Sequence, residues 1–229
     1  MNIAALRRFK FAIFFACMLP LPVMSAAPSV PDPDAAQMPP PAPRSSDVAR
    51  KLAPAQVLAE LKRGGYVIYF RHTSTDFSQN DSQSKGFEDC AHQRNLTDAG
   101  RAQARSIGAA IRELKVPIAK VVASPMCRTM ETARLIFGSA EPVPEMRGTA
   151  ALPVADPNRY SALKNVFSTP YPPGSNLVVA SHGNPFYGAA GPPYLAEGEA
   201  AVIRGLGNGN FEVIARIRVD DWPQLIAAR

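Results

Sequence analysis

Two of the three histidines in the sequence lie just after apolar segments that have the composition of buried strands. His72 comes two residues after the segment Tyr66–Phe70, and His182 directly follows the segment Asn176–Ser181; the third histidine is His92. In an open α/β sheet, ligands bind beyond the carboxyl ends of the strands, so both imidazoles are expected to meet in one site there. A neutral imidazole in such a place can act as a nucleophile.

Two arginines are predicted to point at the same crevice. Arg71 directly precedes His72, and Arg128 opens a predicted helix after a third apolar segment. A forked guanidinium group matches the oxygens of a phosphate group in a bidentate way. We therefore predict that Arg71, Arg128, His72 and His182 form a phosphate-binding site, and that this site contains a nucleophile.

Four short motifs occur along the chain in an informative order. They are Arg71-His72, the run from Leu96 to Gly100 followed by Gln103-Ala104, the run from Ser124 to Ala133 with Arg128-Thr129 at its centre, and Ser181-His182-Gly183-Asn184. Together they resemble the signature of the histidine phosphatase superfamily, which includes the phosphoglycerate mutases, over roughly residues 66 to 184. Four ordered motifs are far more specific than one.

The resemblance implies a metal-independent phosphomonoester hydrolase without a cofactor. His72 is expected to attack phosphorus and form a phosphohistidine, while Arg71, Arg128 and His182 hold the phosphoryl oxygens as charge redistributes. Water then attacks the intermediate. The signature has one departure, because Thr73 stands where the family usually has glycine or alanine. A stiffer, bulkier residue there is expected to change the shape of the pocket.

The group that protonates the leaving oxygen is the least defined part of this prediction. An alkoxide leaves poorly unless a carboxylic acid protonates it. In members that resemble phosphoglycerate mutase, the acid lies in the stretch that here contains Glu141 and Glu145. We take Glu145 as the candidate catalytic acid, with Glu141, Glu197, Glu199 and Asp76 as alternatives. If none of them serves, substrates with good leaving groups, such as phosphohistidine or acyl phosphates, are favoured.

A second class of function is also open. Thr73 and the lack of a clearly matching acid are compatible with a non-catalytic module that binds phosphate on the same scaffold, whereas the intact His72 favours catalysis. Binding of phosphate without a phosphoenzyme would identify the module.

The first 46 residues are predicted to lie outside the folded domain. Three basic residues precede an apolar run from Phe11 to Met24 and then small residues, which is typical of a secretory signal peptide over residues 1–25. Residues 26–46 are rich in proline and alanine, as in an extended linker, and residues 47–229 form the predicted domain. The protein is therefore expected to be an exported, bacterial-type member of the family, periplasmic or secreted, with no stable membrane span after signal removal. An envelope sugar phosphate is a candidate substrate.

The charge of the chain favours a small phosphorylated substrate over nucleic acid. The formal net charge is +6, with 25 basic against 19 acidic residues, and it falls to +3 without the signal. The remaining basic residues are scattered rather than clustered, which argues against a nucleic-acid surface.

Cys90 and Cys127 remain after the signal, which contains Cys17, is removed. In an oxidising compartment they can form a bridge, which would join the loop after His72 to the loop that carries Arg128. The alternative is two buried free thiols. A metal site of Cys90, His92 and Cys127 lacks a fourth ligand, and no metal is expected.

Helices and strands are predicted to alternate along residues 47–229. Helices are expected at Pro54–Arg63, Thr97–Leu114, Arg128–Phe137 and Pro157–Phe167, and strands at Tyr66–Phe70, Lys120–Ser124, Asn176–Ser181, Ala200–Arg204 and Phe211–Val219. The last two strands flank Gly207-Asn208-Gly209-Asn210, which is typical of a hairpin. The fold class is therefore α/β: a three-layer sandwich with a mostly parallel central sheet, helices on both faces, and an antiparallel edge hairpin near the C-terminus.

Overall fold

A computed structural model of the protein describes residues 52–149, 152–153, 156 and 158–229. The predicted signal peptide, the predicted linker and the first five residues of the predicted domain lie outside the described residues. Within the described part, no helix is both long enough and apolar enough to cross a membrane.

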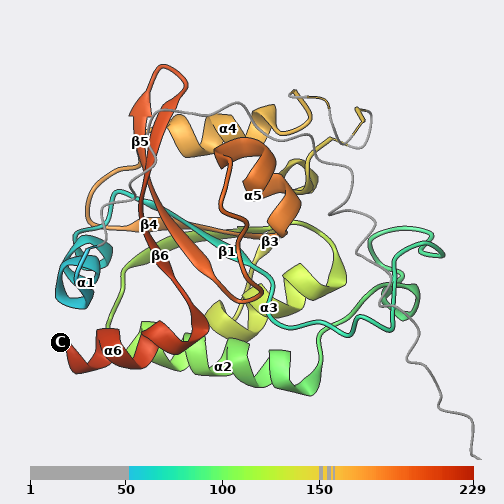
Figure 1. Ribbon diagram of the computed structural model, residues 1–229, viewed down its shortest axis with the longest axis horizontal. Helices are drawn as coiled ribbons and strands as arrows, with labels where there is room; N and C mark the ends of the chain where they lie inside the picture. Colours follow the sequence, from blue (N-terminus) through green and yellow to red (C-terminus); the bar gives the residue numbers. More distant parts are fainter. Residues whose placement is uncertain (1–51, 150–151, 154–155, 157) are drawn as a thin grey trace, which may run out of the picture. The chain divides into compact units, whose positions relative to one another are not determined.

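A six-stranded sheet forms the centre of the described domain (Figure 1). Its strands are β1 (Val67–Arg71), β2 (Ile118–Ala123), β3 (Glu141–Pro142), β4 (Asn176–Ser181), β5 (Ala200–Gly207) and β6 (Asn210–Ile217). Their order is β3-β2-β4-β1-β5-β6, in which β3, β2, β4 and β1 run parallel and β5 is antiparallel to both β1 and β6. The predicted, mostly parallel sheet with an antiparallel edge hairpin is thus confirmed. The two residues between β5 and β6, Asn208 and Gly209, both have positive φ, as a tight hairpin turn requires.

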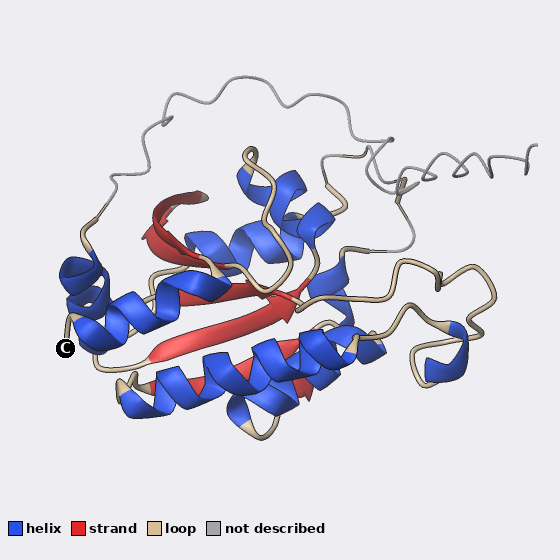
Figure 2. Cartoon of the chain, turned by 60° about the horizontal axis from the view of Figure 1, so that its bottom comes forward, coloured by secondary structure: helices blue, strands red, loops and turns tan. Residues whose placement is uncertain are grey.

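Helices cover both faces of this sheet (Figure 2). They are α1 (Pro54–Arg63), α2 (Asp98–Glu113), α3 (Cys127–Phe137), α4 (Ser161–Ser168), α5 (Gly183–Ala190) and α6 (Trp222–Ala227), with 3-10 helices η1 (Cys90–His92), η2 (Pro144–Arg147) and η3 (Val219–Asp221). Sequence patterns missed α5 and α6, because both are short and contain proline. The predicted helix Pro157–Phe167 begins later, at Ser161.

Strand β1 shows how the core is divided between the two faces. Ile68 and Phe70 pack in a cluster with α1, α2, α3 and α6, whereas Val67 and Tyr69 pack in a second cluster with α4 and α5. Since successive side chains of a strand point to opposite faces, a fully apolar strand is the expected pattern for a sheet covered on both sides. The three-layer architecture is confirmed.

The start of α2 is held against the loop that follows His72. The side chain of Thr97 accepts a hydrogen bond from the backbone N–H of Gly100 and so caps the helix. A Cβ atom on Gly100 would lie 2.1 Å from the carbonyl oxygen of Ser74. Glycine therefore permits a close approach that positions the loop beside the end of β1.

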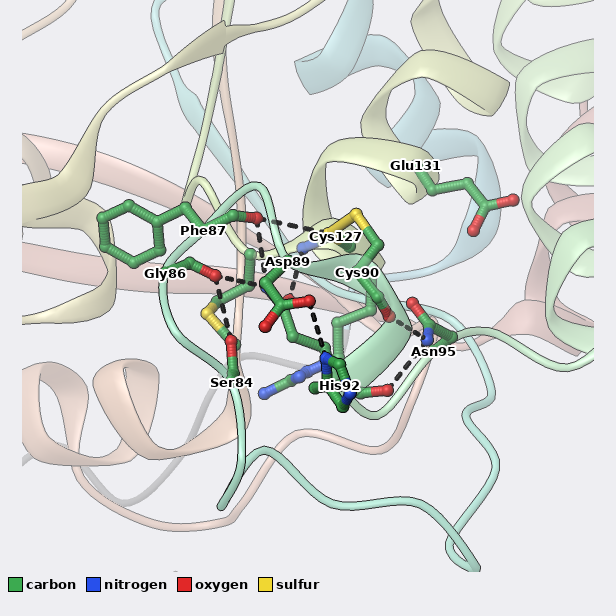
Figure 3. The surroundings of a disulfide bond; sticks show 12 residues. Ser84, Gly86, Phe87, Asp89, Cys90, His92, Asn95, Cys127 and Glu131 are labelled. Atoms are coloured by element: carbon green, nitrogen blue, oxygen red, sulfur yellow. Dashed lines mark hydrogen bonds and ion pairs between the residues drawn. A yellow bond between two sulfur atoms is a disulfide. The ribbon is translucent and has the colours of Figure 1, made fainter.

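A disulfide bond joins Cys90 of η1 to Cys127, the first residue of α3 (Figure 3). The two Cα atoms are 5.7 Å apart, and 37 positions separate the cysteines in the sequence. The buried side chain of Gln93 supports the same junction, because its carbonyl oxygen accepts a 2.9 Å hydrogen bond from the backbone N–H of Cys127. The predicted bridge is confirmed, and it fixes the long loop after β1 to the helix that carries Arg128.

Replacing both cysteines by serine is expected to lower the free energy of unfolding by about 3–4 kcal/mol, since a loop of this length gains that much chain entropy when the bridge is absent. Urea denaturation of the Cys90→Ser, Cys127→Ser variant and of the wild type without reductant measures the difference. Wild-type protein kept reduced should match the variant. Equal stability of all three samples would contradict the expected contribution.

Candidate active site

The two strand-end histidines meet at the carboxyl ends of adjacent parallel strands. Arg71 at the end of β1 is in register with Ser181 at the end of β4, so the next residue of each strand, His72 and His182, emerges at the same edge of the sheet. Their ring centroids are 5.5 Å apart at an interplanar angle of 67°. Both side chains are buried. The structure thus brings together the pair of imidazoles that the sequence places at strand ends.

The ring of His72 is held with one nitrogen free for chemistry. Its Nδ1 atom lies 3.0 Å from the backbone carbonyl oxygen of Thr73. A carbonyl oxygen only accepts, so Nδ1 carries the proton and Nε2 has the lone pair in the neutral ring. Burial holds the pKa of His72 well below its usual value, and the charges of Arg128 and Arg71 lower it further. His72 is therefore a neutral imidazole with a nucleophilic nitrogen at physiological pH.

His182 is also neutral and is held by the end of a neighbouring strand. Its Nε2 atom lies 2.9 Å from the hydroxyl of Ser124, which follows β2, and its backbone carbonyl accepts a 2.7 Å hydrogen bond from the Tyr69 hydroxyl. Burial is the main reason why the pKa of His182 lies well below its ordinary value, and the charge of Arg128 is the next largest cause. Three strands of the sheet, β1, β2 and β4, therefore fix the position of this ring.

The buried neutral histidines are expected to make stability fall in acid. The unfolded chain binds protons at the ordinary histidine pKa of 6.5, whereas the folded chain binds them only at lower pH. Below about pH 6.5 the free energy of unfolding should therefore decrease, by up to about 1.4 kcal/mol per pH unit for each histidine. Urea denaturation at pH 7.5, 6.5 and 5.5 measures this slope.

The control for this pH dependence compares two variants. A variant with both His72→Gln and His182→Gln should show a shallower slope below pH 6.5, whereas His92→Gln should keep the wild-type slope. Identical slopes for the wild type and the double variant would show that these two side chains do not cause the loss.

Arg71 is packed on the side of the site that faces the segment after α5. One of its guanidinium nitrogens donates a 2.8 Å hydrogen bond to the carbonyl oxygen of Leu195, and another lies 3.5 Å from a carboxylate oxygen of Glu197. The guanidinium carbon lies 5.2 Å from the centre of the Tyr194 ring. Among the described residues, the buried Nε atom of Arg71 has no hydrogen-bond partner. A bound anion can supply that missing acceptor.

Arg128 forms a bidentate pair with a carboxylate from the loop after β1. Its two terminal nitrogens lie 2.9 Å from the two carboxylate oxygens of Asp81, and its Nε atom is buried without a partner among the described residues. Burial raises the pKa of Asp81, but the hydrogen bonds and charge of Arg128 outweigh this effect, and the net shift is downward. Asp81 is thus ionised and anchors the guanidinium group.

The pocket around these groups is lined by arginines and by no carboxylate among the described residues. The lining consists of Arg71, His72, Arg94, Arg128, Arg147, Arg159, Tyr160, His182, Gly183, Asn184, Pro185 and Tyr194. All four predicted phosphate-binding residues are in this set. Such a concentration of guanidinium groups next to a neutral imidazole can bind a phosphoryl group and stabilise the charge that develops during its transfer. Within the same described residues, no group of three or more His, Cys, Asp or Glu side chains could hold a metal ion.

The structure does not bring the candidate acids Glu145 and Glu141 together with the histidines. Glu145 lies in η2 with an exposed side chain and is not part of the pocket lining. Glu141 in β3 is also exposed, and its carboxylate lies 2.9 Å from the ammonium nitrogen of Lys120. Both carboxylates thus face solvent.

The three alternative acids also lie outside the pocket lining. Glu199 is buried and forms a close ion pair with Arg216, so its carboxylate is already occupied by a structural partner. Asp76 accepts hydrogen bonds from Ser78, and these bonds lower its pKa. Glu197 is the nearest of the three to the reaction centre, 3.8 Å from Nδ1 of His72, but this is the nitrogen that faces the Thr73 carbonyl.

Thr73 also lies outside the pocket lining. Its backbone N–H donates to the hydroxyl of Thr132, and that hydroxyl donates to the backbone carbonyl of Arg128. The side-chain oxygens of Thr73 and Thr132 are 3.3 Å apart. Through Thr132, Thr73 connects the end of β1 to helix α3, which carries Arg128.

Several lining or supporting residues were missed by sequence reasoning, namely Asp81, Arg94, Arg147, Arg159 and Tyr194. All of them lie in loops, in η2 or next to a helix end, where periodicity carries no information. One weak signal existed for Arg147: no acidic residue lies three or four positions away along the chain. An arginine without such a neighbour has no local partner in a helix and is free to face a ligand.

Comparison with known proteins gives one family match. The model of the histidine phosphatase superfamily (branch 1) matches residues 67–149, which include Arg71, His72 and Arg128. No curated protein sequence matches the chain.

Solved structures with a similar fold include the protein histidine phosphatase SixA in complex with tungstate, at 20% identity over 68% of this chain and 98% of that one, with a TM-score of 0.48. They also include the putative phosphohistidine phosphatase SixA from Agrobacterium tumefaciens, at 15% identity over 67% of this chain and 97% of that one, with a TM-score of 0.47. A mycobacterial glucosyl-3-phosphoglycerate phosphatase is similar at 14% identity over 67% of this chain and 96% of that one, with a TM-score of 0.47.

Proposed function

We propose that this chain, which belongs to the histidine phosphatase superfamily, hydrolyses phosphomonoesters of small molecules through a phosphohistidine on His72. The observation that carries the proposal is the neutral His72 ring, with Nδ1 directed to a carbonyl oxygen, in a pocket lined by arginines. This arrangement offers a lone pair at Nε2 beside groups that neutralise a phosphoryl dianion.

The reaction proceeds in two steps. Nε2 of His72 attacks phosphorus, a phosphorus–nitrogen bond forms, and the bond from phosphorus to the ester oxygen breaks, so that the leaving group takes the electron pair. Arg71, Arg128 and His182 hold the phosphoryl oxygens during the transfer. A water molecule then attacks phosphorus and gives up one proton to solvent, which balances the proton that the leaving group takes from solvent. The bond to His72 breaks, its electron pair returns to Nε2, and inorganic phosphate is released with the ring again neutral. The arginines supply the electrostatic stabilisation of the transferring group.

The predicted signal peptide supports a periplasmic or secreted location, as part of the same proposal. A location outside the cytoplasm makes phosphorylated components of the cell envelope, including sugar phosphates, accessible substrates. The scattered charge of the remaining chain fits a small substrate better than nucleic acid.

A second candidate activity is hydrolysis of phosphorylated compounds that have good leaving groups. It is favoured by the pocket lining, which contains no carboxylate among the described residues. Acyl phosphates and phosphohistidine release a leaving group without the strong acid assistance that an alkoxide needs. The two activities share the phosphohistidine and differ in the substrate.

The test measures hydrolysis by the purified protein, in the presence of EDTA, along a series of p-nitrophenyl, phenyl and alkyl phosphates and of acetyl phosphate. EDTA-resistant release of phosphate from all of them supports the phosphomonoesterase. A steep fall in kcat/KM with rising leaving-group pKa supports the second candidate. If inorganic phosphate binds but none of these compounds is hydrolysed, the protein is a phosphate-binding module and the catalytic proposal is wrong.

A further inference from the structure

The pocket carries more positive charge than one phosphoryl group requires. Arg71 and Arg128 each have a carboxylate partner behind them, Glu197 and Asp81 respectively. The lining also contains Arg147, Arg94 and Arg159. Arg71, Arg128 and the two histidines are enough to bind a single phosphoryl dianion. The additional guanidinium groups therefore need an explanation.

Arg147 and Arg159 differ from the first two arginines in having no carboxylate partner within the described residues. Arg159 donates a hydrogen bond to the backbone carbonyl of Leu152, which is a neutral group. Buried or half-buried arginines normally pair with an anion, because an uncompensated charge away from water is costly. Two such side chains in the lining of one pocket therefore indicate a ligand that supplies the missing negative charge.

The position of Arg147 is fixed relative to the reaction centre. It ends η2, and the preceding residue, Met146, is buried in the core. The carbonyl oxygen of Met146 accepts a 2.7 Å hydrogen bond from the hydroxyl of Ser181, the residue that directly precedes His182. The charge of Arg147 also contributes to the lowered pKa of His182, after the larger effects of burial, Arg128 and His72. Arg147 thus lies beside the imidazoles and is tied to the strand that carries one of them.

Arg159 is brought to the same side of the pocket by a second set of contacts. Its backbone carbonyl accepts a 3.0 Å hydrogen bond from the backbone N–H of Thr149, two residues after Arg147. The buried ring of Tyr160 packs against Gly148, where a Cβ atom would lie 2.7 Å from the ring. Glycine at this position, with a φ of +91°, lets the two segments close on each other. The segments that carry Arg147 and Arg159 are therefore packed and hydrogen-bonded to each other, so the positions of the two arginines are linked.

We propose that Arg147 and Arg159 bind a second anionic group of the substrate, a carboxylate or a phosphate, while Arg71 and Arg128 hold the phosphoryl group that is transferred to His72. The substrate class is then a small molecule with a phosphoryl group and a further anion, in place of a simple phosphomonoester. The assignment of the first anion rests on the proposed function, whereas the binding of a second anion does not.

The test uses pairs of compounds that differ by one anionic group. Glycerol 3-phosphate is compared with 3-phosphoglycerate, in which a carboxylate replaces a hydroxymethyl group, and fructose 1-phosphate is compared with fructose 1,6-bisphosphate. Each is measured as a competitive inhibitor of p-nitrophenyl phosphate hydrolysis, so that its own turnover is not needed. The protein variants are Arg147→Gln, Arg159→Gln and the double variant. The control is Arg105→Gln, an exposed arginine of α2 outside the pocket.

In the wild type, the compound with two anionic groups in at least one pair is expected to bind about 10- to 100-fold more tightly than its matched compound, as charge-assisted hydrogen bonds to two arginines allow. The double variant should lose that preference, because its affinity for the compound with two anionic groups falls more than its affinity for the matched compound. Arg105→Gln should behave as the wild type. The pair that shows the preference distinguishes a carboxylate from a second phosphate.

Equal binding within both pairs by the wild type, or a preference that survives in the double variant, would overturn the proposal. A uniform loss of affinity for all four compounds in the double variant would show instead that these arginines act only on the transferred phosphoryl group. If the wild type does not hydrolyse p-nitrophenyl phosphate at all, the proposed function fails. The same compounds, measured by calorimetry, then still decide whether Arg147 and Arg159 bind the second anion.

Discussion

Replacement of His72 by alanine is expected to reduce hydrolysis of p-nitrophenyl phosphate by at least about 10⁴-fold and to remove the phosphoenzyme completely. The reason is that His72 combines a neutral ring, a fixed tautomer and a place among the arginines, and alanine retains none of these. Rapid quenching with a ³²P-labelled substrate measures the covalent intermediate. A label on the wild type that is stable in base and labile in acid identifies a phosphorus–nitrogen bond.

The matched control for this variant is His92→Ala. His92 is the third histidine of the chain, lies in η1 with an exposed side chain, and pairs with Asp89 outside the pocket lining (Figure 3). It should keep wild-type activity and labelling. A His72→Ala protein that folds normally and still forms a labelled intermediate would show that another residue is the nucleophile.

The second large effect is expected from Arg128→Ala. This variant removes the bidentate guanidinium group from the phosphoryl site, which should lower kcat/KM by about 10²–10³-fold. It also leaves the carboxylate of Asp81 without its partner, and the free energy of unfolding should fall by about 2–3 kcal/mol, since Asp81 is only partly exposed. Steady-state kinetics and urea denaturation measure the two effects separately.

The combination Arg128→Ala with Asp81→Asn separates catalysis from folding. Because the neutral amide has no unpaired charge, the double variant should regain most of the lost stability but none of the lost activity. Arg134→Ala, an exposed arginine on the same helix, is the control and should change neither quantity. Activity that returns together with stability would mean that Arg128 acts through the fold and not on the phosphoryl group.

The strands and their polar ends were predictable from the sequence because both are local features. An apolar run such as Asn176–Ser181 specifies a strand covered on both faces, and the residue that follows it must emerge at the carboxyl edge of the sheet. The same reasoning located His72, Arg71 and Arg128. The bridge between Cys90 and Cys127 was predictable as a hypothesis, because only two cysteines follow the predicted signal peptide.

The choice among candidate acids needed the tertiary structure. Glu145, the acid favoured by resemblance, is exposed on η2, and the buried Glu199 is committed to Arg216. No local pattern distinguishes a carboxylate that reaches a pocket from one that pairs with a neighbour, since the partner comes from elsewhere in the chain.

The remaining parts of the site depend on contacts between distant segments. Asp81 meets Arg128 across 47 positions of sequence, and the arrangement is held by the disulfide and by Gln93. Arg147 and Arg159 reach the pocket because Gly148 allows their segments to close on Tyr160. The sequence alone thus determined the positions of His72, of its strand and of the first two arginines, which follow from the short-range alternation of a strand and the residues at its end. Only the tertiary structure decided which loop charges converge on them, because the path of a loop is set by long-range packing.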